Sequence, residues 1–109
     1  MNVAIIGSRG IKAFDLTPFV PSSATTIISG GARGIDCIAR NFAISNNIPL
    51  VEFLPEYDKY ARSAPIIRNK KIVNAADLVL AIWDGKSKGT AFTIEFAKKQ
   101  NKKVVIVSP

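Results

Sequence analysis

Residues 25–43 read TTIISGGARGIDCIARNFA, and this stretch decides the fold. Thr25–Ser29 is a short, β-branched apolar run, which is typical of a strand buried on both faces. Gly30–Gly34 follows it as a glycine-rich loop. Beyond the loop, apolar residues recur at the spacing of an amphipathic helix, at Ile35, Ile38, Ala39, Phe42 and Ala43. The stretch therefore predicts a strand, a glycine loop and a helix in direct succession.

The same alternation extends along the chain, where four further apolar runs predict strands: Val3–Ile6, Leu50–Leu54, Leu78–Trp83 and Val104–Val107. Two further helices are predicted over about Ala64–Ala75 and Thr90–Gln100. Pro18 and Pro21 allow only a short helix within Gly10–Ala24. Strands that alternate with helices form right-handed βαβ units. We therefore expect residues 1–109 to form a single Rossmann-like domain, a three-layer α/β sandwich with a mostly parallel sheet of about five strands.

Composition excludes several classes of protein. The chain has no histidine, so Ser–His–Asp triads, Cys–His dyads and histidine-ligated metals are excluded. Its single cysteine, Cys37, cannot form an internal disulfide, which fits a reducing compartment. The start of the chain lacks the basic region and apolar length of a signal peptide, and no stretch approaches ~18 consecutive apolar residues. We therefore expect a cytoplasmic protein with no membrane partner, no metal and no cofactor.

Glycine-rich loops follow three of the predicted strands, at Gly7–Gly10, Ser29–Gly34 and Asp84–Thr90. The carboxyl ends of parallel strands share one edge of a sheet, so these loops converge at the edge where ligands of open α/β sheets bind. Glycine lets the backbone approach a ligand closely, and the start of the following helix offers free N–H donors to a phosphate. The chain has a net charge of +7, and these loops carry four of its cations: Arg9, Arg33, Lys86 and Lys88. Together these features predict a phosphate or nucleotide site.

Short motifs narrow the type of site. Gly85–Gly89 matches the G-x-S-x-G pattern of a hydrolase nucleophile elbow, but the triad cannot be completed without histidine. The chain contains no G-x-x-x-x-G-K-[ST] pattern of a P-loop NTPase, and no G-x-G-x-x-G follows its first strand. The sequence therefore predicts neither a serine hydrolase nor a P-loop enzyme nor an ordinary NAD-binding domain.

These motifs together resemble the SLOG superfamily over nearly the full length of the chain. That group joins the Rossmann-like domain of DNA-processing protein A (Smf/DprA), the Lonely-Guy phosphoribohydrolases and small stand-alone proteins related to YpsA. The most specific match is Ile28–Asp36, which is similar to the S-G-x-A-R-G-I-D signature of DNA-processing protein A. Three other segments resemble the family's first strand and loop, its R-N-x-x-I helix and its G-x-S-x-G-T loop: Val3–Arg9, Ile67–Ile72 and Gly85–Thr90.

The resemblance implies a Rossmann-like fold, a nucleotide-type ligand and, because family members are commonly dimers, a homodimer. It implies that the glycines and Arg33 of the second loop line a phosphate site, with Arg68 and Asn69 beside the ligand. Asp36 either orients Arg33 or caps the start of the helix. The candidate ligand-binding residues are Gly7, Ser8, Arg9, Gly30, Gly31, Arg33, Gly34, Asp36, Arg68, Asn69, Gly85, Ser87, Gly89 and Thr90.

One position departs from the phosphoribohydrolases, which carry P-G-G-x-G-T-x-x-E with a catalytic glutamate. Thr93 stands at that glutamate position, and Glu95 lies about 200° further around the helix, so it cannot simply substitute. Binding or sensing of a nucleotide is the favoured function. Single-stranded DNA binding, as in DNA-processing protein A, and hydrolysis of a nucleotide's N-glycosidic bond by one of the available acids stay open: Asp36, Asp84 or Glu95. Further candidates for contacts to a ribose or base are Trp83, Asp84, Tyr57 and Tyr60.

Overall fold

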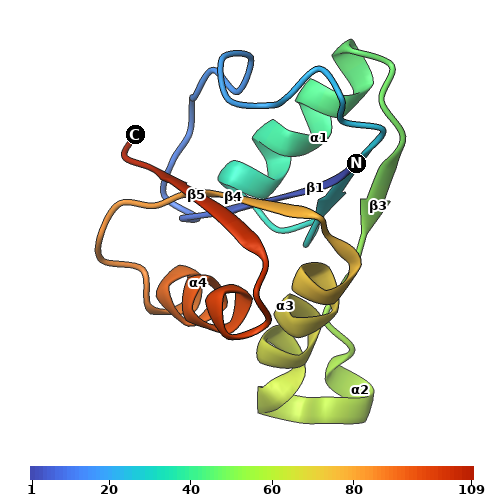
Figure 1. The fold of residues 1–109 in the computed structure, drawn as a ribbon. Coiled ribbons are helices and arrows are strands. Elements are labelled where there is room, and N and C mark those ends of the chain that lie inside the picture. The colour runs from blue at the N-terminus through green and yellow to red at the C-terminus, as the bar shows by residue number, and fades with distance from the viewer.

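The computed structural model describes residues 1–109 and contains one five-stranded sheet (Figure 1). Its strands are β1 (Asn2–Gly7), β2 (Thr26–Ser29), β3 (Leu50–Glu52), β4 (Leu78–Ile82) and β5 (Lys103–Val107). They lie in the order β3-β2-β1-β4-β5, and every neighbouring pair is parallel. The expected α/β class with a parallel sheet of five strands is confirmed.

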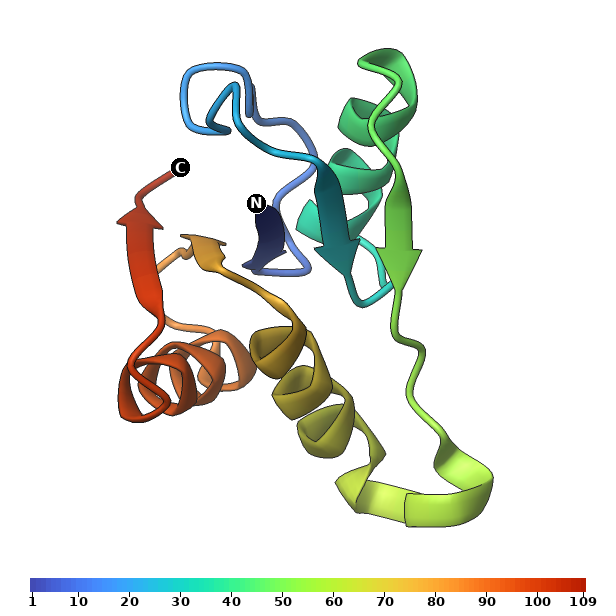
Figure 2. The same cartoon turned by 45° about the vertical axis from the view of Figure 1, so that its right-hand side comes forward.

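Helices cover both faces of this sheet. α1 (Ile35–Ser45) packs on one face, and α3 (Ala64–Ala75) and α4 (Lys88–Lys99) pack on the other, as Figures 1 and 2 show. A short helix, α2 (Tyr57–Tyr60), and a 3-10 turn, η1 (Ala61–Ser63), precede α3. The layers form the three-layer sandwich that the sequence predicts. None of the helices has the length and apolar content that a membrane span requires.

The side chains of the central strands alternate between two hydrophobic cores. Val3 and Ile5 of β1 pack on the α1 side, whereas Ala4 and Ile6 pack on the side of α3 and α4. β4 is buried along its whole length because both of its faces are covered. Strands covered on both faces have no solvent-facing side, which is why continuous apolar runs predict them better than alternating ones.

The connection from β1 to β2 has no helix. The sequence allows a short one, but Pro18 and Pro21 interrupt the segment, and it forms turns and loop instead. Leu16 anchors the connection in the core on the α1 side. Phe14 and Phe19 stack beside it with ring centroids 5.5 Å apart. In this connection, packed side chains and not a helix cover the sheet on the α1 side.

Other differences from the sequence-based expectation fall at the ends of elements. β3 ends at Glu52, although the apolar run continues to Leu54. α4 begins at Lys88 rather than at Thr90, because Ser87 occupies the N-cap position. The sequence pattern did not predict α2 or η1. The earlier start of α4 is the difference that affects the site, since it brings Gly89 into the first helical turn.

The strand order fixes where a ligand can bind. The chain moves outward from β1 through β2 to β3, and then crosses back to place β4 on the other side of β1. The order therefore reverses between β1 and β4. In open α/β sheets, ligands bind outside the carboxyl ends of the strands at such a reversal. The loops that follow β1 and β4 meet at this point.

Candidate functional site

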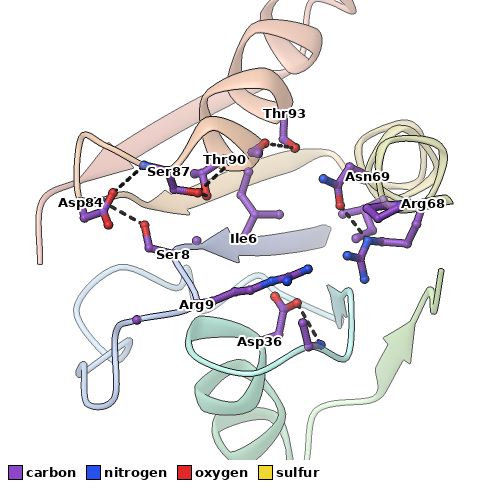
Figure 3. Close-up of a pocket in the computed structure, with 16 residues that line it drawn as sticks. Ile6, Ser8, Arg9, Asp36, Arg68, Asn69, Asp84, Ser87, Thr90 and Thr93 are labelled. Carbon is purple, nitrogen blue, oxygen red and sulfur yellow. Dashed lines mark hydrogen bonds between the residues drawn. The ribbon is translucent and has the colours of Figure 1, made fainter. Parts of the chain in front are cut away.

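A cavity of about 440 Å³ opens at the carboxyl ends of β1 and β4 (Figure 3), and we call it the main cavity. Its walls come from the loop after β1, the start of α1, one face of α3 and the β4–α4 loop. Only three of its 16 lining residues are hydrophobic. A second hollow of about 320 Å³, the side depression, adjoins it and shares Arg9, Ala32 and Arg68. Both volumes lie in the usual range for small-molecule sites.

The structure brings together most of the residues that the sequence singles out. Those that line the main cavity are Gly7, Ser8, Arg9, Asp36, Arg68, Asn69, Ser87, Gly89 and Thr90. Those that line the side depression alone are Gly30, Gly31 and Arg33. Gly34 and Gly85 line neither hollow, and Lys86 and Lys88 are exposed outside both.

Asp84 organises the loop after β4. Its Oδ1 accepts hydrogen bonds from the amides of Lys86 and Ser87 at 2.8 and 2.9 Å. Its own amide donates to Ser8 Oγ at 3.2 Å, and the indole Nε1 of Trp83 donates to the carbonyl of Ser87 at 3.0 Å. The amides of the loop stabilise the carboxylate, so the pKa of Asp84 is lowered. Both Asp84 and Trp83 therefore hold the loop in shape.

The first turn of α4 faces the main cavity. Ser87 Oγ caps it, at 3.4 Å from the amide of Thr90 and 3.1 Å from Thr90 Oγ1. A Cβ added to Gly89 would meet no atom within 4 Å. Thr93 Oγ1 donates to the carbonyl of Gly89 at 2.9 Å. The turn therefore presents backbone amides and the hydroxyls of Ser87 and Thr90 to the cavity, with no side chain at Gly89 to cover them.

Arg68 is a buried charged residue, only 6% exposed, on the wall between the two hollows. Its Nη1 donates to the carbonyls of Gly30 at 2.6 Å and Phe53 at 3.5 Å, and its Nε donates to Asn69 Oδ1 at 2.8 Å. Its Nη2 makes no hydrogen bond within the protein. Burial lowers the pKa of Arg68, although arginine stays charged at neutral pH.

Asp36 lies at the start of α1, near Arg68 (Figure 3). Its Oδ2 accepts a hydrogen bond from the amide of Ala32 at 3.1 Å and so closes the loop after β2. Burial raises the pKa of Asp36 against the opposing effects of that amide and of Arg68. Asp36 makes no hydrogen bond to Arg33, and the N-cap of α1 is Gly34. Its role is therefore neither of the two that the sequence suggests.

Arg9 reaches over the main cavity from the loop after β1 (Figure 3). It is exposed and belongs to none of the ion pairs of the protein. Its positive charge is one of the causes that lower the pKa of Arg68, so the two guanidinium groups are close enough to repel. An anion bound between Arg9 and Arg68 would offset this repulsion, because it attracts both guanidinium groups.

Several lining residues that the sequence interpretation missed lie on the same helix faces as predicted ones. Pro65 and Ile72 are three and four residues from Arg68 on α3, and Thr93 is three residues after Thr90 on α4. Helical spacing alone could have identified them, because residues three and four apart share a face. The other lining residues outside the candidate set are Ile6, Gly10 and Ala32, whereas Asp84, a further candidate for a ribose or base contact, also lines the cavity.

Acidic residues are sparse in the main cavity. Thr93, which stands where the phosphoribohydrolase pattern has its glutamate, is buried and lines the cavity. The side chain of Glu95 is 66% exposed and lies 3.8 Å from Lys98 in an exposed ion pair. The carboxylates that do line the cavity are those of Asp36 and Asp84, and each accepts hydrogen bonds from its own loop. No carboxylate therefore replaces the missing glutamate at its helical position.

No protein-family model, no curated protein and no solved structure matches this chain. Its function is therefore inferred from its own residues and their arrangement. No three His, Cys, Asp or Glu side chains lie together as a group that could hold a metal ion. The main cavity offers two guanidinium groups, the backbone amides of a helix start, four hydroxyl side chains, the amide of Asn69 and two carboxylates.

Proposed function

We propose that the main cavity binds a nucleotide or another phosphate ligand derived from a nucleotide. The observation that carries the proposal is the meeting of Arg9 and the buried Arg68 with the N-terminus of α4 in one polar cavity. The planar guanidinium group of arginine matches pairs of phosphate oxygens. The N–H groups and dipole of a helix start favour the same negative charge. Two independent sources of positive potential thus converge on one space.

The first turn of α4 adds features suited to a phosphate. The hydroxyls of Ser87 and Thr90 line the cavity and can donate to phosphate oxygens. Gly89 has no side chain to cover the amides of Lys88 and Gly89, which have no partner within the protein, so an oxygen can approach them closely. A glycine in a helix costs about 0.5–1 kcal/mol relative to alanine. No neighbouring atom in the chain requires glycine here, whereas a bound ligand would.

The remaining polar groups suit the sugar or base of a nucleotide. Asn69 uses its Oδ1 to accept from Arg68, while its Nδ2 makes no hydrogen bond within the protein. Asp36 adds a carboxylate, which can accept hydrogen bonds, on the opposite wall of the cavity (Figure 3). A few such groups at fixed positions are what give a small-molecule site its specificity. This is the ligand class that the resemblance to the SLOG superfamily implies.

We propose binding or sensing rather than cleavage of the ligand. Cleavage of an N-glycosidic bond needs a carboxyl group near the ribose that can carry a proton or stabilise the cation. Glu95 is directed to solvent, and Asp84 is held by the amides of Lys86 and Ser87 with a lowered pKa. Asp36 lines the cavity with a raised pKa, but it accepts the amide of Ala32 at the start of α1 and lies on another element than the helix that carries the glutamate in the phosphoribohydrolase pattern. These features support a site that holds its ligand intact.

The test is calorimetric titration of the protein with a panel of small nucleotides, compared with its Arg9→Ala and Arg62→Ala variants. Both arginines are exposed, so neither substitution removes buried packing, and both lower the net charge equally. Only Arg9 lines the cavity. We expect at least one nucleotide to bind and Arg9→Ala to weaken it at least tenfold, because a hydrogen bond to a charged group contributes about 1.5–3 kcal/mol. Arg62→Ala should stay within twofold of the parent.

Thermal unfolding tests ligand binding independently, through the stability of the protein. A ligand at 100 times its Kd should add about 2.7 kcal/mol to the free energy of unfolding. In a domain of this length that corresponds to an increase in Tm of about 10 °C. A panel with no binder would contradict the proposal. Equal weakening by Arg9→Ala and Arg62→Ala would also contradict it, since binding would then follow net charge and not the cavity.

A further inference from the structure

The side depression differs from the main cavity in its charge. Arg9, Arg33 and Arg68 line it, and no carboxylate does. The main cavity, by contrast, contains Asp36 and Asp84 beside two of these arginines. The side depression therefore has three arginines and no carboxylate among its lining residues, and it favours an anionic group.

The two hollows adjoin each other. Arg9, Ala32 and Arg68 line both of them, so the guanidinium groups of the two arginines stand on the boundary. Arg68 contributes to this boundary from a buried position, with Nη1 and Nε fixed by hydrogen bonds and Nη2 without a partner in the protein. A ligand that extends from one hollow to the other must therefore pass two positively charged side chains, of which Arg68 is held in place by its hydrogen bonds.

Tyr57 gives the side depression a flat surface that the main cavity lacks. It is the first residue of α2, it is 57% exposed, and it stands at the rim beside Pro55. No aromatic residue lines the main cavity. Exposed aromatic rings beside a basic groove stack with nucleic-acid bases of any sequence. The only aromatic side chain of the combined site thus lies beyond the arginine boundary.

We propose that the side depression binds a second nucleoside unit, joined through phosphate to the nucleotide in the main cavity, with its linking phosphate at the arginine boundary and its base on Tyr57. This inference rests on the proposed function and names the ligand class more closely, as a phosphodiester-linked pair of nucleosides. Both a free dinucleotide and the end of a single strand contain that unit. A mononucleotide would fill the main cavity alone.

The experiment measures the Kd of AMP and of 5′-phosphorylated diadenylate, pApA, by calorimetry at one salt concentration. We expect pApA to bind at least tenfold more tightly than AMP, a difference that corresponds to about 1.4 kcal/mol. Tyr57→Ala should remove this gain, and Tyr57→Phe should keep it because the ring remains. Tyr57 does not line the main cavity, so the Kd of AMP should stay within twofold in both variants.

Tyr60→Ala is the matched control, since Tyr60 ends the same short helix and lines neither hollow. It should leave the gain for pApA intact. Arg33→Ala should reduce the gain several-fold without changing the Kd of AMP, because Arg33 lines the side depression alone, and Arg62→Ala should have no effect. Retention of the full gain in Tyr57→Ala would overturn the inference.

The outcomes separate this inference from the proposed function. If AMP binds in an Arg9-dependent way and pApA binds no better, the proposed function stands and the second nucleoside site does not exist. If neither ligand binds, the second nucleoside site fails, and the proposed function fails with it only if no nucleotide of the panel binds. Longer oligodeoxyadenylates then identify the source of the unit. A Kd that stops improving at two nucleotides indicates a free dinucleotide, whereas continued tightening to eight nucleotides, with a steep dependence on salt, indicates a strand.

Discussion

The loops after β2 and β4 are both rich in glycine, but they use their glycines differently. In the loop after β2, a Cβ on Gly30 would lie 2.5 Å from Arg68 Nη1, and Gly34 has a φ of 74° with its Cβ position 2.5 Å from the carbonyl oxygen of Arg9. In the loop after β4, Gly89 has no atom within 4 Å of its Cβ position. The loop after β2 needs glycine for its own packing. In the loop after β4 the positive φ of Gly85, 80°, also requires glycine, but nothing in the chain requires it at Gly89, in the first turn of α4.

Each loop also has one aspartate that accepts its backbone amides, and the two aspartates differ in the same way. Asp36 is partly buried, and this burial raises its pKa. Asp84 is exposed, and the amides of its loop lower its pKa. The loop after β2 is therefore a tightly packed part of the protein, and its internal contacts offset the strain of its glycine conformations and the desolvation of Asp36. The loop after β4 is a solvated turn that leaves backbone amides accessible, as a ligand requires.

Gly34→Ala is expected to produce the largest loss of stability. The substitution combines a backbone conformation that side chains avoid with overpacking against the backbone of Arg9, at a total cost of about 3 kcal/mol. Thermal unfolding should show a decrease in Tm of about 10–15 °C. Gly10→Ala is the control, because its Cβ would enter open space and its φ is not positive. Similar losses in both variants would show that the loop after β2 is not a tightly packed wall.

The two aspartates should give pH dependences of opposite sign. Asp36 has a raised pKa in the folded protein, so the folded state binds more protons than the unfolded state between the two pKa values. The parent should therefore lose stability relative to Asp36→Asn as the pH rises from the ordinary pKa of an aspartate to the raised one. Asp84 has a lowered pKa, so the parent should gain stability relative to Asp84→Asn as the pH rises through the window below that ordinary value.

Urea unfolding of the parent and both variants between pH 3 and pH 7 measures these differences. Subtracting each variant from the parent cancels the groups that are common to both, such as Asp15 and Glu56, whose pKa values are also lowered. Asparagine keeps an oxygen that can accept the same loop amides, so the loops should remain closed. If the difference in unfolding free energy between parent and variant changed with pH in the same direction for Asp36→Asn and Asp84→Asn, the two loops would not differ as a buried and a solvated loop.

The fold could be predicted from the sequence because its signals are local and repeated. Apolar runs such as Leu78–Ile82 and the helical spacing of Ile35, Ala39 and Ala43 are readable in short windows, and alternation fixes the parallel sheet. Helix α2 was missed because Tyr57–Tyr60 is only four residues long and has no buried residue. A segment that short carries too little periodicity to stand out.

The site was only partly predictable, for a different reason. Converging loops indicate which residues come near one another, but they do not indicate which glycines serve the chain and which serve a ligand. Gly34 and Gly89 look equivalent in the sequence, and only the distances around their Cβ positions separate them. The two roles predicted for Asp36, orienting Arg33 or capping α1, were wrong for the same reason. Its partner is the amide of Ala32, and the shape of the loop sets that contact.

Gly89→Ala is the smallest and most specific change, and it should act in opposite directions on stability and on binding. Alanine lowers the entropy of the unfolded chain and fits the helical backbone without a clash, so the free protein should become more stable by roughly 0.5 kcal/mol. The added methyl group would project where a ligand must approach the first turn of α4, so the Kd of the nucleotide found by titration should rise at least tenfold. Chemical denaturation and calorimetry on the same preparation measure both quantities. A more stable variant with unchanged affinity would mean that the loop after β4, like the loop after β2, owes its glycine to the chain and not to a ligand.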